Sequence, residues 1–157
     1  MEQIFKFIID ARKAFIKDIE SLTLEQLNEI PAGFNNNIIW NFGHIVVTTP
    51  ILCYVRSGIW ADASQVKYAS SYAKGTKPTY FVTQAEVDEL KALAISSIEK
   101  IEAAYNAGEF GTIIPFETST YGATLNSIEE IIITTAGHDN THLGYVTAQK
   151  RIINNNK

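Results

Sequence analysis

The sequence predicts an all-α protein: a four-helix bundle in up-down-down-up order, with a long connection between the second and third helices. Four segments carry apolar residues at steps of three and four, which is the spacing of an amphipathic helix. Proline and glycine gather in the stretches between these segments. The chain has 157 residues, 46% of them hydrophobic, which suits one core. We therefore expect residues 1–157 to form a single domain.

The first helix is expected over residues 2–22. Its apolar residues form one stripe along one face of the helix. The stripe consists of Ile4, Ile8, Ala11, Phe15, Ile19 and Leu22. Residues 21–37 contain Pro31-Ala32-Gly33, so they should end this helix and hold a turn or a short helical piece.

The second helix is expected over residues 38–57. It is apolar nearly all round, which indicates deep burial. Pro50 removes one backbone hydrogen bond, so the helix should kink there. Cys53 falls on the side opposite His44 and is expected to be a buried, inert thiol.

The third and fourth helices follow two irregular stretches. Residues 59–82 show no clear period, and a link of that length can recross the bundle, which favours the up-down-down-up order. Thr83 and Glu86 predict a capping box at the start of the third helix, which Ala107-Gly108 ends. Its expected stripe is Val87, Leu90, Ala94, Ile98, Ile101 and Tyr105. In residues 109–123 an extended piece is expected at Thr112-Ile113-Ile114, and the fourth helix is expected from Thr124 to Ile153.

Composition excludes several classes of protein. A single cysteine rules out a disulfide scaffold. The net charge of −4, without a run of Lys or Arg, argues against nucleic-acid binding. Charges interrupt the N-terminus, so no signal peptide is expected. The longest apolar candidate for a membrane span, residues 45–55, is too short and contains Pro50. We expect a cytoplasmic protein without nucleic-acid or membrane partners.

The chain has three histidines, and their positions are unusual. His138 and His142 lie four residues apart, so they share a helix face about 6 Å apart. That face is the expected core stripe of the fourth helix: Ile128, Ile131, Thr135, His138, His142, Tyr145 and Gln149. His44 lies inside the apolar second helix. Burying an imidazole with an unpaired nitrogen costs about 1–3 kcal/mol, so these positions call for an explanation.

A divalent metal ion would explain all three histidines, since two ligands at i and i+4 and a third from a facing helix leave coordination positions open. The alternative is three separately satisfied core histidines, or histidines on a surface. Gly43, Gly137 and Gly144 flank them and indicate close helix approach or room for a ligand; tight packing without a ligand is the alternative. Four nearby polar residues could accept an imidazole N–H or could lie on the surface. They are Asn41, Thr48, Thr134 and Thr135.

Asp139 occupies the position of the general base in the His-Glu-x-x-His helix of zinc proteases. It points about 60° away from His142 and 100° from His138 at 100° per residue, which places it at the rim of the site. A solvated or outer role is therefore favoured over that of a base.

Two motifs make the chain resemble the DinB/YfiT-like family. Asn36-Asn37-Ile38-Ile39-Trp40-Asn41-Phe42-Gly43-His44-Ile45 is similar to the family's second-helix pattern, a Trp four residues before the His of a Gly-His pair. Gly137-His138-Asp139-Asn140-Thr141-His142-Leu143-Gly144-Tyr145 resembles its fourth-helix ending.

The resemblance implies an up-down-down-up bundle that holds zinc or nickel on His44, His138 and His142. The family often has Glu where this chain has Asp139, which puts a role for that carboxylate in doubt. Members include metal-dependent transferases of low-molecular-weight thiols and a proposed metal-dependent hydrolase. Substrate does not follow from membership.

The function expected is a metal-dependent S-transferase that uses a low-molecular-weight thiol as co-substrate, with a role in the stress response. Alternatives are a metal-dependent hydrolase, a non-catalytic domain that binds a metal or small ligand, and a structural dimerisation bundle. Phe5, Phe7 and Ile9 widen the apolar face of the first helix, so we expect a homodimer. Loop aromatic residues could wall a pocket: Trp60, Tyr68, Tyr72, Tyr80, Phe116 and Tyr121.

Overall fold

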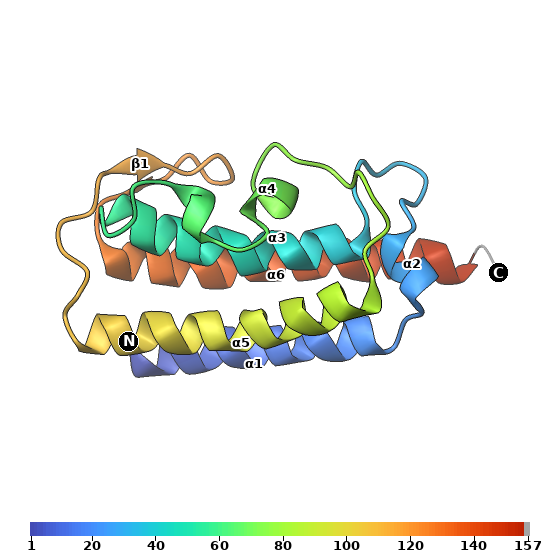
Figure 1. Ribbon diagram of the computed structural model, residues 1–157, viewed down its shortest axis with the longest axis horizontal. Helices are drawn as coiled ribbons and strands as arrows, with labels where there is room; N and C mark the ends of the chain where they lie inside the picture. Colours follow the sequence, from blue (N-terminus) through green and yellow to red (C-terminus); the bar gives the residue numbers. More distant parts are fainter. Residues whose placement is uncertain (156–157) are drawn as a thin grey trace.

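The computed structural model describes residues 1–155, and it confirms the all-α class. Four long helices lie side by side (Figure 1). They are α1 (Glu2–Glu20), α3 (Ile38–Pro50), α5 (Gln84–Asn106) and α6 (Ile128–Asn155). The connections between them contain short elements: α2 (Leu24–Asn28), η1 (Ile51–Val55), η2 (Ala63–Gln65), α4 (Ala69–Tyr72), β1 (Phe116–Glu117) and β2 (Thr124–Leu125).

The four long helices surround a common interior. α1 and α3 each pack against both α5 and α6. One apolar cluster gathers around Phe15 and Phe42, and a second around Phe5 and Ile131. The two long connections lie over the side of the bundle that carries α3 (Figure 1). The bundle therefore offers a covered face where α3 and α6 meet.

The register of two helices differs from the sequence prediction. In α1 the buried positions include Phe5 and Arg12 rather than Ile4 and Ala11. In α6 the buried positions include Asp139, while the predicted core residue Tyr145 is 51% exposed. The buried residues of α6 recur at alternating steps of three and four, as in a heptad repeat. They do not follow the stripe that the sequence predicted through both His138 and His142.

Helix α3 begins with Asn37, whose side chain accepts a hydrogen bond from the backbone N–H of Trp40 at 2.9 Å. At Pro50 the α-helix passes into the π-helical turn η1. The stretch Ile38–Val55 is longer than the apolar candidate expected from the sequence, and by length and composition alone it could cross a membrane. However, 72% of it is buried inside the bundle, which is the burial of a core helix.

The predicted capping box of α5 is only half formed. Thr83 accepts from the backbone N–H of Glu86 at 3.4 Å. The Glu86 carboxylate instead accepts from the hydroxyl groups of Tyr72 and Tyr80. The carboxylate thereby links α5 to the connection that covers α3.

The predicted start of α6 at Thr124 is wrong. Thr124 pairs with Glu117 in the antiparallel hairpin of β1 and β2, so the helix begins at Ile128. Ser127 accepts from the backbone N–H of Glu130 at 3.2 Å, which satisfies a free donor of the first turn. The extended piece expected at residues 112–114 also lies further along the chain, in β1.

Candidate metal centre

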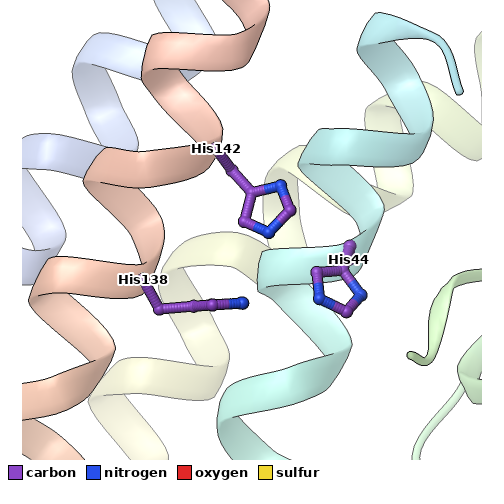
Figure 2. Close-up of side chains that lie close together, drawn as sticks. All are labelled: His44, His138 and His142. Carbon is purple, nitrogen blue, oxygen red and sulfur yellow. The ribbon is translucent and has the colours of Figure 1, made fainter. Parts of the chain in front are cut away.

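The structure brings the three histidines together. His44 comes from α3, and His138 and His142 come from successive turns of α6. Each offers one ring nitrogen, and these three atoms lie within 4.8 Å of one another. Figure 2 shows the rings converging on the space between the two helices.

The His44 ring is held by a backbone group and an aromatic side chain. Its Nδ1 lies 2.7 Å from the carbonyl oxygen of Tyr72, so Nδ1 carries the proton and donates it. The indole of Trp40 stacks on the ring, with centroids 4.9 Å apart and planes 9° apart. The remaining nitrogen, Nε2, keeps its lone pair for a ligand bond.

The His142 ring is oriented by Asn41. Its Nδ1 lies 2.8 Å from Asn41 Oδ1. The Asn41 amide nitrogen donates to the carbonyl of Asn37 at 2.9 Å and to Gln149 Oε1 at 3.1 Å. These bonds fix which end of the amide faces the histidine, so Nε2 is again the free nitrogen.

Asn41 is thus the one of the four predicted polar partners that holds a ring through a short hydrogen bond. The hydroxyl of Thr48 lies 3.4 Å from Nε2 of His44. Thr135 donates to the carbonyl of Ile131, and Thr134 lines the adjoining cavity. The Tyr72 carbonyl was not predicted, because a backbone group in an aperiodic connection leaves no signal in the sequence.

Asp139 lies in the interior rather than at the rim, which corrects the sequence prediction. Its side chain is 2% exposed and accepts from Nε of Arg12 at 2.7 Å. Its second oxygen, Oδ1, is buried without a hydrogen-bond partner in the described chain and lies 3.9 Å from Nδ1 of His138. Burial raises the pKa of Asp139, and the guanidinium beside it opposes that rise.

Arg12 is a central residue that the sequence analysis did not single out. Its side chain is fully buried and joins all four long helices. Besides Asp139 on α6, it donates to Ala94 on α5 and to Ile45 and Thr49 on α3, at 2.8–3.0 Å. The sequence did carry one signal for it: position 12 lies at helical spacing with the apolar positions 8, 15 and 19 of α1, on the same face of the helix.

The electrostatics keep the histidines neutral. Burial lowers the pKa of all three; His138 falls to about 4 and His142 to about 3, with repulsion from neighbouring charged groups adding to the effect. Neutral imidazole is the form that binds metals. The three neutral rings therefore fit a divalent ion as ligands. Asp139 Oδ1, which has no hydrogen-bond partner in the described chain, is the nearby group that could accept a hydrogen bond from Nδ1 of His138.

A cavity of about 420 Å³ opens beside the histidines. All three rings contribute to its wall, together with residues of both long connections. Of the predicted aromatic residues Phe116 and Tyr121 line it, whereas Trp60, Tyr68, Tyr72 and Tyr80 do not.

Cys53 lies outside the cavity lining and is fully buried, as predicted. Burial raises the pKa of its thiol to about 12. A thiol with that pKa stays protonated at neutral pH, so Cys53 offers neither a nucleophile nor a metal ligand.

The three glycines near the histidines have different explanations. A Cβ on Gly43 would stand 2.5–2.7 Å from ring carbons of Tyr72, so glycine lets that residue approach α3. A Cβ on Gly137 would stand 3.0 Å from the Tyr121 hydroxyl oxygen. Among residues 1–155 nothing lies within 4 Å of the place that a Cβ on Gly144 would occupy, so close packing does not explain this glycine.

The fold and this site define a helical bundle with a three-histidine group that can hold a metal ion. The family model described as DinB superfamily matches residues 8–146, and the chain belongs to that superfamily. A search of curated proteins finds no match to the chain.

Proposed function

We propose that the protein is a metal-dependent enzyme, and more specifically a transferase that uses a low-molecular-weight thiol. The observation that carries the proposal is the set of three neutral imidazoles, each with a nitrogen available to a metal, at the wall of a cavity of about 420 Å³. A structural site is normally closed by four protein ligands, whereas a catalytic one leaves room for substrate.

His44, His138 and His142 would hold the ion, and zinc or nickel suits such ligands. When bound, a divalent cation lowers the pKa of a thiol that coordinates it, so that the thiolate is available at neutral pH. Neutral ligands leave the full charge of the cation to act on that thiol. Trp40 and Tyr72 hold the His44 ring and Asn41 holds the His142 ring, so these two rings need little reorganisation at the moment of reaction.

The placement of carboxylates favours a thiol over water as the nucleophile. A hydrolase usually positions a carboxylate as general base beside the attacking water. Asp139 is engaged by Arg12 and faces the interior. A metal-dependent hydrolase remains the second candidate, because Glu117 lines the cavity and could serve as that base.

The up-down-down-up order of the four long helices is part of the proposal. Contacts between Asp18 and Lys150 and between Arg12 and Asp139 support parallel directions for α1 and α6. The bond between Asn41 and Gln149, together with the approach of His44 to His142, supports opposite directions for α3 and α6.

The homodimer and the cytoplasmic location are also proposals. Phe5 lies in the core rather than on the apolar face predicted for the dimer interface. The half-exposed Phe7 on α1 is the residue of that face that supports a homodimer.

The function is tested with metal-stripped protein reloaded with zinc or nickel. Small thiols are offered with a soft electrophile such as 1-chloro-2,4-dinitrobenzene, and thioether formation is followed by absorbance. We expect turnover that requires both the metal and the thiol and that His44→Ala abolishes, with Gly144→Ala as the matched control. Thiol-independent hydrolysis of an ester that is lost in Glu117→Gln would favour the hydrolase, and one bound metal without any turnover would favour a non-catalytic domain.

A further inference from the structure

The carboxylate of Asp139 has one oxygen that nothing around it uses. Its Oδ2 accepts from Nε of Arg12 at 2.7 Å. Its Oδ1 is the one nitrogen or oxygen among the buried side-chain atoms of residues 1–155 that has no hydrogen-bond partner. Leaving a charged oxygen unsatisfied in the interior costs free energy, and native proteins do so rarely. Oδ1 therefore calls for a partner or a role.

The ring of His138 offers that partner. Its Nδ1 lies 3.9 Å from Oδ1 of Asp139, and an approach by about 1 Å would bring the two atoms to hydrogen-bond distance. His138 is only partly buried, at the wall of the cavity. In Figure 2 the tip of its ring, where Nε2 lies, points toward the other two histidines. A proton on Nδ1 that faces Asp139 would thus leave the lone pair of Nε2 for a metal.

The other two histidines already have this arrangement. Nδ1 of His44 lies 2.7 Å from the carbonyl oxygen of Tyr72, and Nδ1 of His142 lies 2.8 Å from Oδ1 of Asn41. Histidines that bind a metal through one nitrogen usually donate the other N–H to a carboxylate, a carbonyl or a water. Asp139 would complete the set with a carboxylate for the third ring.

Arg12 fixes the direction in which Asp139 faces. Besides Asp139, its guanidinium donates to the carbonyls of Ala94 and Ile45 and to the hydroxyl of Thr49, at 2.8–3.0 Å. A guanidinium held by α3 and α5 in this way keeps Oδ2 on its own side and leaves Oδ1 on the side of the histidine. Arg12 itself does not line the cavity.

We propose that Asp139 is the positioning residue of His138. Its Oδ1 accepts the Nδ1 proton and so presents Nε2 to the metal, while Arg12 holds the carboxylate in the required orientation. This inference rests on the metal centre of the proposed function. It is independent of the thiol and of the reaction that the centre carries out.

Asp139→Asn separates this role from a structural one, because an amide has a single acceptor oxygen. Nε–H of Arg12 requires that oxygen, so the amide NH₂ group would face His138 and donate to its Nδ1. The ring proton would then lie on Nε2, the nitrogen that the metal needs; such a change can leave the geometry intact and still impose the wrong tautomer. Calorimetric titration with zinc at pH 7 should show an affinity reduced by about 10–100-fold. Asp88→Asn, the same change at an exposed position of α5, should leave the affinity unaltered.

The tautomer itself is read in metal-free protein labelled with ¹⁵N-histidine. The chain has three histidines, and the ring signals of His138 are identified by their loss in His138→Gln. Long-range ¹H–¹⁵N spectra at pH 7 should show the proton on Nδ1 in the unaltered chain and on Nε2 in Asp139→Asn. The rings of His44 and His142 should keep their tautomers in both proteins, since their acceptors are unchanged.

A second variant covers the case of a poorly folded Asp139→Asn. Arg12→Met/Asp139→Leu replaces the buried ion pair by apolar groups, a change that folded proteins often tolerate. It has no acceptor for Nδ1 of His138, so its zinc affinity should also fall by about tenfold or more. Zinc binding as tight as that of the unaltered chain would overturn the inference.

The outcomes distinguish this inference from the proposed function. If the unaltered chain binds no zinc, the metal-dependent function fails and the inference fails with it. If it binds zinc and Asp139→Asn binds zinc equally well, only the inference is overturned. A proton on Nε2 of His138 in the unaltered chain would overturn it too. Weaker zinc binding by Asp139→Asn with the tautomer of His138 unchanged would have the same consequence, because it would show a purely structural role.

Discussion

Replacing Arg12 by Met tests whether the buried charge network holds the bundle together. The guanidinium is fully buried, and its partner Asp139 is 2% exposed. Methionine fills a similar volume but removes the bond to Asp139 at 2.7 Å and the bonds to Ala94, Ile45 and Thr49 at 2.8–3.0 Å. The Asp139 carboxylate then stays in the interior with no cation beside it.

The expected loss is large. Removing one partner of a buried ion pair costs about 3–5 kcal/mol, because the other charge is left uncompensated. A domain of this size is usually stable by about 5–15 kcal/mol, so Arg12→Met should lose a large fraction of the free energy of unfolding. The double variant Arg12→Met/Asp139→Leu replaces the pair by apolar groups and should recover about 3 kcal/mol of that loss or more.

Urea unfolding of the metal-free proteins at pH 7, followed by circular dichroism, gives the free energies and the m-values. Unchanged m-values would show that the folded state is preserved. An Arg12→Met variant that loses less than about 1 kcal/mol, or a double variant less stable than Arg12→Met alone, would refute the reasoning.

Three further predictions follow from the site and the surface. Gly43→Ala should destabilise the protein by about 1–3 kcal/mol in thermal melts, because the new Cβ would collide with the ring of Tyr72. It should also weaken zinc binding, since the carbonyl of Tyr72 holds the His44 ring. The control Gly144→Ala, whose new Cβ meets open space among the described residues, should be neutral or slightly stabilising. The free energy of unfolding of the metal-free protein should fall as the pH drops from about 6.5 to 4, by about 1.4 kcal/mol per pH unit for each of His138 and His142, because the unfolded histidines take up protons near pH 6.5 and these two folded ones only near pH 4 and pH 3. His44, whose pKa burial also lowers, should add to the loss, and a metal-free protein whose stability is flat over that range would contradict the lowered pKa values. Light scattering at micromolar concentration should give twice the monomer mass, and Phe7→Lys should shift it toward the monomer; a monomer at every concentration would end the dimer proposal.

The sequence was sufficient to predict the helical fold and the histidine cluster, for a shared physical reason. Helical spacing shows in the sequence whenever side chains of one kind repeat every three or four residues. His138 and His142 stand out on such a pattern, and His44 stands out in an otherwise apolar helix.

The sequence analysis missed charged residues that are buried and contacts that depend on the tertiary structure. Arg12 lies at an apolar spacing but carries a charge, so it was left out of the core. Asp139 was placed at the rim because the buried face of α6 was drawn through both histidines, whereas they lie at its edge, facing the cavity. The Tyr72 carbonyl and the hairpin of β1 and β2 depend on tertiary contacts of aperiodic connections, which no local pattern reports.

The most direct test of the account is the metal stoichiometry of the three-histidine centre. Metal-stripped protein is titrated with zinc by calorimetry at pH 7, beside His44→Ala, His142→Ala and the control Gly144→Ala. The account predicts about one equivalent for the unaltered chain and the control, and a loss of most of the affinity in both histidine variants. Zinc uptake that is absent in the unaltered chain, or that is the same in the histidine variants, would contradict it.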